Sequence, residues 1–328
     1  MMARASEKIL ITGALGYLGG RITSHLVANS PETSLRLMTR PDREGLPDWV
    51  TGLDVVRADL HDQASLQSAV DSIDTVVHLA AMNEIDSQKD PDMAINVNGL
   101  GTHQLLTACR EKGVRRFIYL STFHVYGPGA SQPITEQSPT RPIHPYAFSH
   151  RLAEDYVNWF QFTHGMETLI LRLSNGYGYP ADSQVNQWTL VFNDLATQAV
   201  QKGEITLRSS GTQHRDFISL TDVARGIQHF LDLPSGGWGD GLFNLGGECS
   251  MSIKDVAEQV ASEYLLYSGK TIPVTFGEDD GFSSAEPVLF SVDKLKKTGF
   301  HLTDNMSEEI IRTFQLSESM ATSDRPGI

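Results

Sequence analysis

The residue types best suited to chemistry in this chain are Tyr146 and His150, which lie four positions apart. At this spacing both side chains project from one face of a helix. A tyrosine can exchange a proton with a hydroxyl or carbonyl group, but its pKa of about 10 must be lowered for efficient work at neutral pH. His150 offers little charge for this purpose, because the reference pKa of histidine is about 6.5. The pair therefore indicates acid–base chemistry in which the partner of the tyrosine is mostly neutral.

Three glycines near the start of the chain form a second candidate site. Gly13, Gly16 and Gly19 follow an apolar run at residues 8–12 and precede helical apolar spacing at residues 21–27. A strand, a glycine turn and a helix in this order bind the pyrophosphate of a dinucleotide. Gly13 would permit the tight turn, Gly16 the close approach of backbone to pyrophosphate, and Gly19 the packing of helix on strand. The positive end of the helix would favour the phosphate charge, so we predict nucleotide binding here.

The elements that must position these residues alternate along the first half of the chain. Apolar, β-rich runs predict strands at residues 8–12, 34–39, 53–58, 75–81, 116–121 and 167–173. Helices are expected between them at residues 63–71, 97–112 and 145–163. This alternation predicts an α/β fold of the Rossmann type, with a doubly wound parallel sheet covered by helices on both faces. Ligands should then lie at the carboxyl ends of the strands.

The pattern changes after residue 174, where glycine, proline and aromatic residues become frequent. We predict a dinucleotide-binding domain made of residues 1–174 and about 222–245, with a helix at 222–233 and a strand at 241–245. Residues of about 175–221 and 246–316 would form a smaller, mixed α/β substrate domain. The polar residues 317–328 are expected to form a disordered tail.

Composition and charge limit the partners. The chain has 328 residues, of which 40% are hydrophobic and 20% charged, as in soluble globular proteins. A net charge of −14 opposes binding to nucleic acid or to anionic membranes. Cys109 and Cys249 lie far apart without metal-ligand spacing, which predicts reduced thiols and no metal site. Because no signal peptide or 18-residue apolar window is present, the expected location is the cytoplasm.

Several short motifs occur in a fixed order along the chain. They are Thr12-Gly13-x-x-Gly16-x-x-Gly19, Asp59-Leu60, His78-Leu79-Ala80-Ala81, Asn96-Val97-Asn98-Gly99, Leu120-Ser121-Thr122-x-x-Val125-Tyr126-Gly127, Tyr146, Arg172-Leu173-Ser174-Asn175, His214-Arg215-Asp216-Phe217 and Phe243-Asn244-Leu245-Gly246-Gly247. In this order they resemble the extended short-chain dehydrogenases/reductases, specifically the nucleotide-sugar epimerase/dehydratase group (UDP-galactose 4-epimerase-like). The resemblance covers nearly the whole chain and implies the same Rossmann-type fold.

The resemblance implies roles for the central residues. Tyr146 would be the catalytic acid/base on a substrate hydroxyl or carbonyl, and Thr122 would hydrogen-bond the same oxygen. The family motif is Tyr-x-x-x-Lys, so His150 stands where a lysine lowers the tyrosine pKa and binds the nicotinamide ribose. His150 can bind the ribose but lowers the pKa only when protonated, and Arg151 is rotated by about 100° around the helix. The departure predicts a slower enzyme, a shifted pH optimum or lost redox activity.

The expected cofactor is NADP or NAD, with NADP preferred. NAD-specific folds place Asp or Glu at the end of the second strand, whereas this chain has Thr39 and Arg40, with Arg43 nearby. Arginines suit a 2′-phosphate, although a solvated loop is the alternative. By family analogy Asp59 and Leu60 flank the adenine. The expected cofactor contacts are Gly13, Gly16, Tyr17, Leu18, Gly19, Thr39, Arg40, Asp59, Leu60, Leu79, Ala80, Ala81, Asn96, Tyr146 and His150.

The reaction type is narrowed by Phe123 and His124. Sugar 4,6-dehydratases of the family carry an Asp-Glu pair at these positions, and the glutamate of the decarboxylases is also missing here. This leaves 4-epimerisation through a transient ketone, or reduction of a keto-sugar by NADPH. The expected substrate contacts are Asn83, His124, Asn175 and Arg215. His124 is either an auxiliary acid/base or a packed histidine.

Two other functions stay open at this point. The acidic segment 277–285 lacks the arginine that many relatives supply there, which weakens the assignment of a nucleotide-linked sugar. The acidic residues 278–280 favour a dehydrogenase for a non-sugar alcohol or ketone, whereas Asn175 and Arg215 oppose it. The chain could also be a cofactor-binding protein of the same fold with weakened or lost catalysis. In the family, the helices expected at 97–112 and 145–163 pair across a two-fold axis, so the resemblance implies a homodimer.

Overall fold

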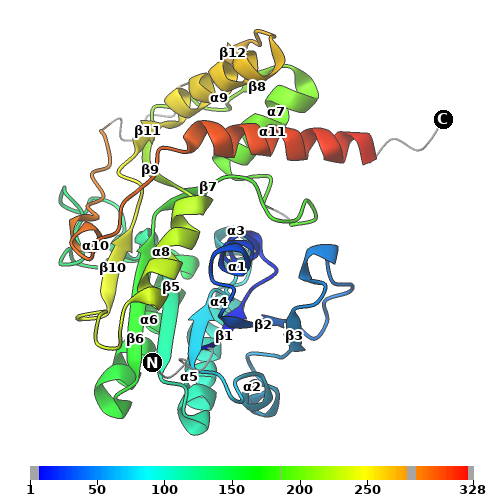
Figure 1. The fold of residues 1–328 in the computed structure, drawn as a ribbon. Coiled ribbons are helices and arrows are strands. Elements are labelled where there is room, and N and C mark those ends of the chain that lie inside the picture. The colour runs from blue at the N-terminus through cyan, green and yellow to red at the C-terminus, as the bar shows by residue number, and fades with distance from the viewer. Residues whose placement is uncertain (1–6, 186, 279–285, 324–328) are drawn as a thin grey trace.

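The centre of the molecule is a seven-stranded parallel sheet, shown in Figure 1. The computed structural model describes residues 7–185, 187–278 and 286–323. The strand order is β10-β6-β5-β4-β1-β2-β3. The strands are β1 (Lys8–Thr12), β2 (Ser34–Thr39), β3 (Asp54–Arg57), β4 (Thr75–His78), β5 (Arg116–Thr122), β6 (Glu167–Leu173) and β10 (Leu242–Leu245). The order reverses between β1 and β4, and in such sheets ligands bind outside the carboxyl ends of the strands at that point.

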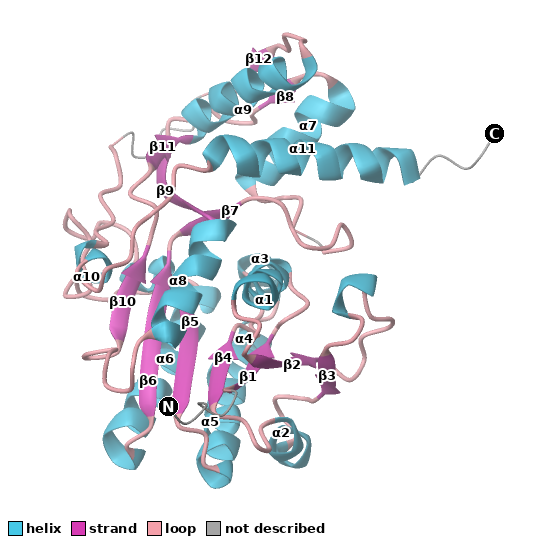
Figure 2. Ribbon diagram, in the orientation of Figure 1, coloured by secondary structure: helices cyan, strands magenta, loops and turns pink. Residues whose placement is uncertain are grey.

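Helices cover both faces of this sheet (Figure 2). Side chains alternate between the two faces along each strand, so Ile9 and Ile11 of β1 pack into one apolar cluster and Leu10 into the other. The first cluster joins α1 and α8 to the sheet, and the second joins α2, α5 and α6. The helices are α1 (Tyr17–Asn29), α8 (Leu220–Asp232), α2 (Gln63–Ala69), α5 (Gly101–Lys112) and α6 (Pro145–His164).

The C-terminal elements gather beyond β7, where Figure 1 shows α7, α9 and α11 side by side. β7 pairs with β9 in parallel and β9 with β11 in antiparallel orientation, giving a mixed three-stranded sheet. Phe192, Val256 and Phe314 belong to a separate apolar cluster in this region. The elements are β7 (Asn175–Tyr177), α7 (Val191–Lys202), β8 (Ile205–Thr206), β9 (His214–Ser219), β11 (Ser250–Ser252), α9 (Ile253–Ser268), β12 (Val274–Thr275) and α11 (Met306–Ser323).

Short helical segments complete the chain. They are the 3-10 helices Asp48–Val50 and Phe123–Tyr126, α3 (Glu84–Lys89), α4 (Pro91–Ala94), the π-helix Ile95–Leu100 and α10 (Asp293–Lys296). Residues 95–100 therefore complete one continuous helical stretch from α4 to α5, with wider turns in the middle. Within the described residues, no helix is both long and apolar enough to cross a bilayer.

The fold class predicted from the sequence is confirmed, with local corrections. β4 ends at His78 rather than at residue 81, because the N–H groups of Leu79 and Ala80 donate to the Thr12 hydroxyl (3.1 and 3.2 Å) instead of to a strand. The expectation of a disordered tail is wrong for residues 317–323, which continue α11. Ser317 is fully buried, and the Tyr267 hydroxyl on α9 donates to Glu318 at 2.7 Å, so packing holds this last part of the helix. Residues 324–328 lie outside the described part.

Candidate active site

The predicted catalytic residues meet where β5 ends and α6 begins. Thr122 is the last residue of β5, and α6 starts at Pro145, after His144 caps the helix by accepting from the Ala147 N–H. The Tyr146 and His150 rings lie one turn apart with their centroids 4.5 Å apart. The Thr122 side chain hydrogen-bonds the Tyr146 phenol. The sequence spacing and the end of a strand thus bring the three side chains together.

Burial keeps both titratable groups of this cluster neutral. Burial raises the pKa of Tyr146 to about 12, although the hydrogen bond from Thr122 acts in the opposite direction. Burial also lowers the pKa of His150 to about 4, although the charge of Glu154 opposes this shift. At pH 7 the imidazole is therefore uncharged and does not lower the pKa of the phenol. This agrees with the expectation that His150 replaces only part of what a lysine would do.

His150 makes one hydrogen bond and leaves one nitrogen unused. Its Nδ1 lies 2.6 Å from the Tyr119 hydroxyl on β5. Its Nε2 is buried and has no hydrogen-bond partner among the described residues. A buried polar atom without a partner is costly, so such an atom in a site suggests a ligand group that completes it. A ribose hydroxyl would fit this nitrogen.

The glycine turn lies at the carboxyl end of β1, beside the end of β4. Gly13 has φ +64°, and a Cβ there would stand 2.9 Å from the Ala80 nitrogen. A Cβ at Gly19 would stand 2.1 Å from the Gly13 carbonyl oxygen, so the first turn of α1 packs directly on the turn before it. Gly16 caps α1 with extended backbone. The turn therefore offers unobstructed backbone at a helix N-terminus, which fits a dinucleotide pyrophosphate.

The other expected cofactor residues differ in what their side chains do. The Tyr17 hydroxyl donates to the Gly178 carbonyl at 2.7 Å, so this side chain is bonded to the segment that follows β7. Leu18 packs on the core, Thr39 is buried at the end of β2, and Arg40 is exposed beside Asp42. The remaining residues are Asp59 (exposed, accepting from the His61 N–H), Leu60 (buried), and Leu79, Ala80 and Ala81, which directly follow β4.

The structure favours Asn98 over Asn96 as the asparagine of the site. Asn96 is exposed, whereas Asn98 is buried. The Asn98 side chain accepts from the Met82 N–H at 2.7 Å and donates to Ser149 at 2.9 Å, which ties the strand-end segment to α6. The sequence held a signal for this choice: Asn98 lies four residues before Thr102 and seven before Leu105, on the buried face of the helix.

The expected substrate residues come from four separate segments. Asn175 begins β7 and donates to the Asp216 carbonyl at 2.9 Å, so it lies next to Arg215 on the neighbouring strand β9. Asn83 instead caps α3, accepting from the Asp86 N–H and donating to the Asp86 carboxylate. These two hydrogen bonds commit much of the Asn83 amide to the helix.

His124 stands beside two groups that sequence reasoning missed, Glu84 and His144. Its Nε2 lies 3.9 Å from the Glu84 carboxylate, and its ring centroid lies 5.1 Å from that of His144 and 6.0 Å from that of Tyr146. Burial lowers the pKa of His124 to about 4, with the charge of Glu84 acting in the opposite direction. Burial also lowers the pKa of Arg215, while Glu84 opposes this shift. His124, Glu84 and Arg215 therefore share one electrostatic neighbourhood next to Tyr146.

Beneath the site lies a buried ion pair that was also missed. Glu154, two turns after Tyr146 on α6, accepts from the Ser121 hydroxyl at 2.6 Å and from both Nε and an Nη of Arg172, at 2.9 and 2.7 Å. Another arginine, Arg151, donates to the same carboxylate at 2.9 Å. Because Ser121 precedes Thr122, the network fixes the end of β5 against α6. A carboxylate four residues after His150 on an apolar helix face was the available signal.

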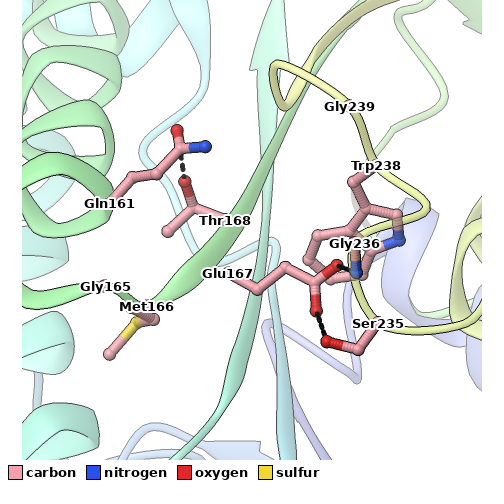
Figure 3. A pocket seen from close by; sticks show the side chains of 9 residues that line it. All are labelled: Gln161, Gly165, Met166, Glu167, Thr168, Ser235, Gly236, Trp238 and Gly239. Atoms are coloured by element: carbon pink, nitrogen blue, oxygen red, sulfur yellow. Dashed lines mark hydrogen bonds between the residues drawn. The ribbon is translucent and has the colours of Figure 1, made fainter.

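The cavity in Figure 3 lies away from these residues. It has a volume of about 310 Å³ and opens between Gln161 and Glu167 on one side and the 235–239 loop on the other. Glu167 accepts there from the Ser235 hydroxyl and the Gly236 N–H at 2.9 and 2.7 Å. Glu167 pairs in register with Arg116, at the opposite end of β5 from Thr122. The cavity therefore lies at the amino ends of the strands, opposite the end that carries Thr122.

The fold and the site define a dinucleotide-binding enzyme of the oxidoreductase type. The glycine turn and the tyrosine–threonine pair both lie at the carboxyl ends of the parallel strands. A profile of the NAD dependent epimerase/dehydratase family matches residues 9–246, and the chain belongs to this family. The UDP-glucose 4-epimerase of Azospirillum brasilense is 30% identical over 290 residues, which are 84% of this chain and 81% of that protein. The dTDP-D-glucose 4,6-dehydratase of Mus musculus is 28% identical over 270 residues, 78% of this chain and 72% of that protein.

A solved structure supports the same fold. The UDP-glucose 4-epimerase of Thermus thermophilus, in complex with NAD, superposes with a TM-score of 0.77 at 24% identity. The superposition covers 95% of this chain and 99% of that one. The family profile and the 30% identical relative confirm the predicted family and the prediction of an NAD(P)-dependent enzyme. The preference for NADP finds no support in these relatives.

Proposed function

We propose that the protein transfers hydride at C4 of a nucleotide-linked sugar, either as a 4-epimerase or as a ketoreductase. The observation that carries the proposal is the convergence of Thr122, Tyr146 and the unpartnered Nε2 of His150 at the sheet edge that also holds the glycine turn. Phe123 and His124 replace the acidic pair expected of a dehydratase, so proton removal at a neighbouring carbon has no carboxylate at these positions.

The chain's own residues would divide the work as follows. Tyr146 moves the proton at the reacting oxygen, and the Thr122 hydroxyl holds that oxygen in place. His150 Nε2 binds a ribose hydroxyl of the cofactor, and Arg215 binds substrate phosphate as a charged donor. The bound cofactor would supply the hydride acceptor in oxidation, the hydride donor in reduction and, when oxidised, a positive charge. Since His150 is neutral, Tyr146 depends on that charge more than it would beside a lysine.

The cofactor we propose is NAD. The family's name and the NAD-bound relative support it. Arg40 is largely exposed and lies 3.6 Å from Asp42, whose charge would oppose a 2′-phosphate. The loop that holds both is fastened by Arg57, which donates to the carbonyls of Pro41 and Arg43 at 3.1 and 2.6 Å. Measured dissociation constants for NAD and NADP test the choice of cofactor. If Arg40 contacts the 2′-phosphate, Arg40→Ala should weaken the binding of NADP but not that of NAD.

The central test is turnover of nucleotide sugars by the purified protein. With NAD, C4 epimers of UDP- or dTDP-hexoses should interconvert, or with NADH a 4-keto sugar should be reduced. Tyr146→Phe should abolish this, whereas Tyr156→Phe on the same helix should not. Because the pKa of Tyr146 is raised to about 12, the rate of epimerisation, in which Tyr146 first removes a proton, should rise with pH above neutrality. Cofactor binding without turnover of any sugar in the panel would contradict the proposal.

A second candidate is a cofactor-binding protein whose catalysis has weakened. It is favoured by the neutral state of His150 and the raised pKa of Tyr146. His150→Lys separates the two. A large gain in rate, with the pH profile moved to lower pH, indicates an eroded site. A loss indicates that histidine is the adapted residue. The non-sugar alcohol suggested by segment 277–285 rests mainly on residues 279–285, which lie outside the described part of the chain.

The assembly we propose is a homodimer formed through α5 and α6. Phe148, Trp159 and Phe162 follow one face of α6, and Trp159 and Phe162 are 46% and 88% exposed. Large apolar side chains grouped on a surface indicate a protein interface. Trp159→Asp should convert a dimer to a monomer in analytical ultracentrifugation. Leu266→Asp, at an exposed leucine on α9, is the matched control and should leave the mass unchanged.

A further inference from the structure

The hydrogen bond between Tyr119 and His150 sets which nitrogen of the histidine carries the proton. Tyr119 lies on β5, on the face of the sheet that packs against α6. Its hydroxyl stands 2.6 Å from His150 Nδ1, and both residues are 2% exposed. A neutral imidazole has one N–H donor and one acceptor nitrogen, so the partner of one nitrogen determines the role of the other.

We propose that Tyr119 is a positioning residue that donates its hydroxyl proton to Nδ1 and thereby fixes His150 as the Nε2–H tautomer. The inference rests on the proposed function, in which this nitrogen binds the cofactor ribose. A lysine at this position is always a donor, whereas a histidine is a donor only in the correct tautomer. Tyr119 therefore ensures that His150 presents a hydrogen-bond donor at Nε2, as the lysine of the family motif always does.

Two observations give the direction of the hydrogen bond. Within the described residues, the Tyr119 hydroxyl has no hydrogen-bond partner other than His150 Nδ1. If Nδ1 donated instead, the buried phenol proton would have no acceptor among the described residues. Burial raises the pKa of Tyr119 well above its usual value, so the phenol keeps the proton that it donates.

The surroundings of His150 leave the imidazole neutral. The groups that interact with it are His78 from β4, Tyr119 from β5, Tyr146 and Glu154 from α6, and His124 from the turn after β5. Glu154 is already held by Ser121, Arg172 and Arg151. The direct control of the tautomer is thus the Tyr119 hydroxyl.

The test reads the tautomer in the wild-type protein without any substrate. In 15N NMR of histidine-labelled protein at pH 7, the His150 signal, assigned by its loss in His150→Lys, should show a protonated Nε2 and a bare Nδ1. A protonated Nδ1 would overturn the inference, whatever the activity of the enzyme. Because this measurement needs no variant of Tyr119, it stays decisive even if such a variant does not fold.

The second measurement is the dissociation constant of NAD. Tyr119→Phe should allow both tautomers of His150 and weaken the binding of NAD by roughly 2- to 12-fold, the range expected for the loss of one neutral hydrogen bond. In the His150→Lys background the same substitution should have little effect, because lysine needs no tautomer. Tyr126→Phe is the matched control, since this buried hydroxyl donates to Asn244 at 2.6 Å and not to His150. Equal effects of Tyr119→Phe in both backgrounds, or no effect in either, would overturn the inference.

The outcomes separate this inference from the proposed function. A wild-type protein with the Nε2–H tautomer and a tautomer-dependent affinity for NAD, but without turnover of any nucleotide sugar, refutes the function and supports the role of Tyr119. Turnover of a nucleotide sugar by a protein with protonated Nδ1 supports the proposed function and refutes the role of Tyr119.

Discussion

The carboxylate of Glu154 allows a sharp test of how the active site is held together. It accepts hydrogen bonds from Ser121, Arg172 and Arg151, and both Glu154 and Arg172 are buried. Glu154→Gln keeps the size of the side chain but leaves the Arg172 guanidinium without a counter-charge. Removing one partner of a buried pair costs about 3–5 kcal/mol of unfolding free energy.

The neighbouring residue Asp155 provides the matched control. It also pairs with Arg151, at 2.6 Å, but its side chain is 56% exposed. Exposed pairs contribute about 0–1 kcal/mol, so Asp155→Asn should change the free energy of unfolding by less than about 1 kcal/mol. Urea unfolding followed by circular dichroism measures both variants under the same conditions. Similar losses for the two variants would refute the reasoning that burial makes Glu154 costly to neutralise.

The ion pair between Glu154 and Arg172 also makes the free energy of unfolding depend on pH. Burial alone would raise the pKa of Glu154, but the hydrogen bonds and charge of Arg172 outweigh it, so the pKa lies below its usual value. A carboxyl with a lowered folded-state pKa stabilises the protein above its unfolded pKa of about 4.3. This stabilisation is lost as the pH falls towards the folded-state pKa. Glu154→Gln should therefore reduce the slope of stability against pH below about pH 4.3, and an unchanged slope would contradict the assignment.

Two further predictions concern α1. Gly19→Ala should abolish NAD binding and lower the melting temperature, because the new Cβ would stand 2.1 Å from the Gly13 carbonyl oxygen. Gly226→Ala on α8 is the control and should keep NAD binding, because the atom nearest to its Cβ would be the tip of the Leu245 side chain, at 3.0 Å. Glu309→Gln should cost about 3–5 kcal/mol in urea unfolding, because it leaves buried Arg21 without its partner at 2.7 Å, whereas exposed Glu308→Gln should cost under about 0.5 kcal/mol.

The sequence predicted those parts of the candidate site that depend on local spacing. Tyr146 and His150 are one helical turn apart, and the glycines of the first turn are diagnostic because each has a separate steric reason. Tyr119, Asn98 and Glu154 were missed because their roles depend on partners 16 to 51 positions away in the chain. Such pairings follow from the order of strands in the sheet, which periodicity does not reveal. The predicted disordered tail failed for a similar reason: the polar segment 317–323 is helical because α11 packs on other elements.

The ion pair between Arg21 and Glu309 has a consequence for the order in which the molecule can be made. Arg21 lies on α1, directly after the glycine turn, yet its carboxylate partner follows 288 residues later on α11. At a synthesis rate of about 5–20 residues per second, this separation corresponds to roughly 15–60 s on the ribosome. During that interval Arg21 has been made but the Glu309 carboxylate has not. The first-made part of the site thus reaches its final form only when one of the last helices arrives.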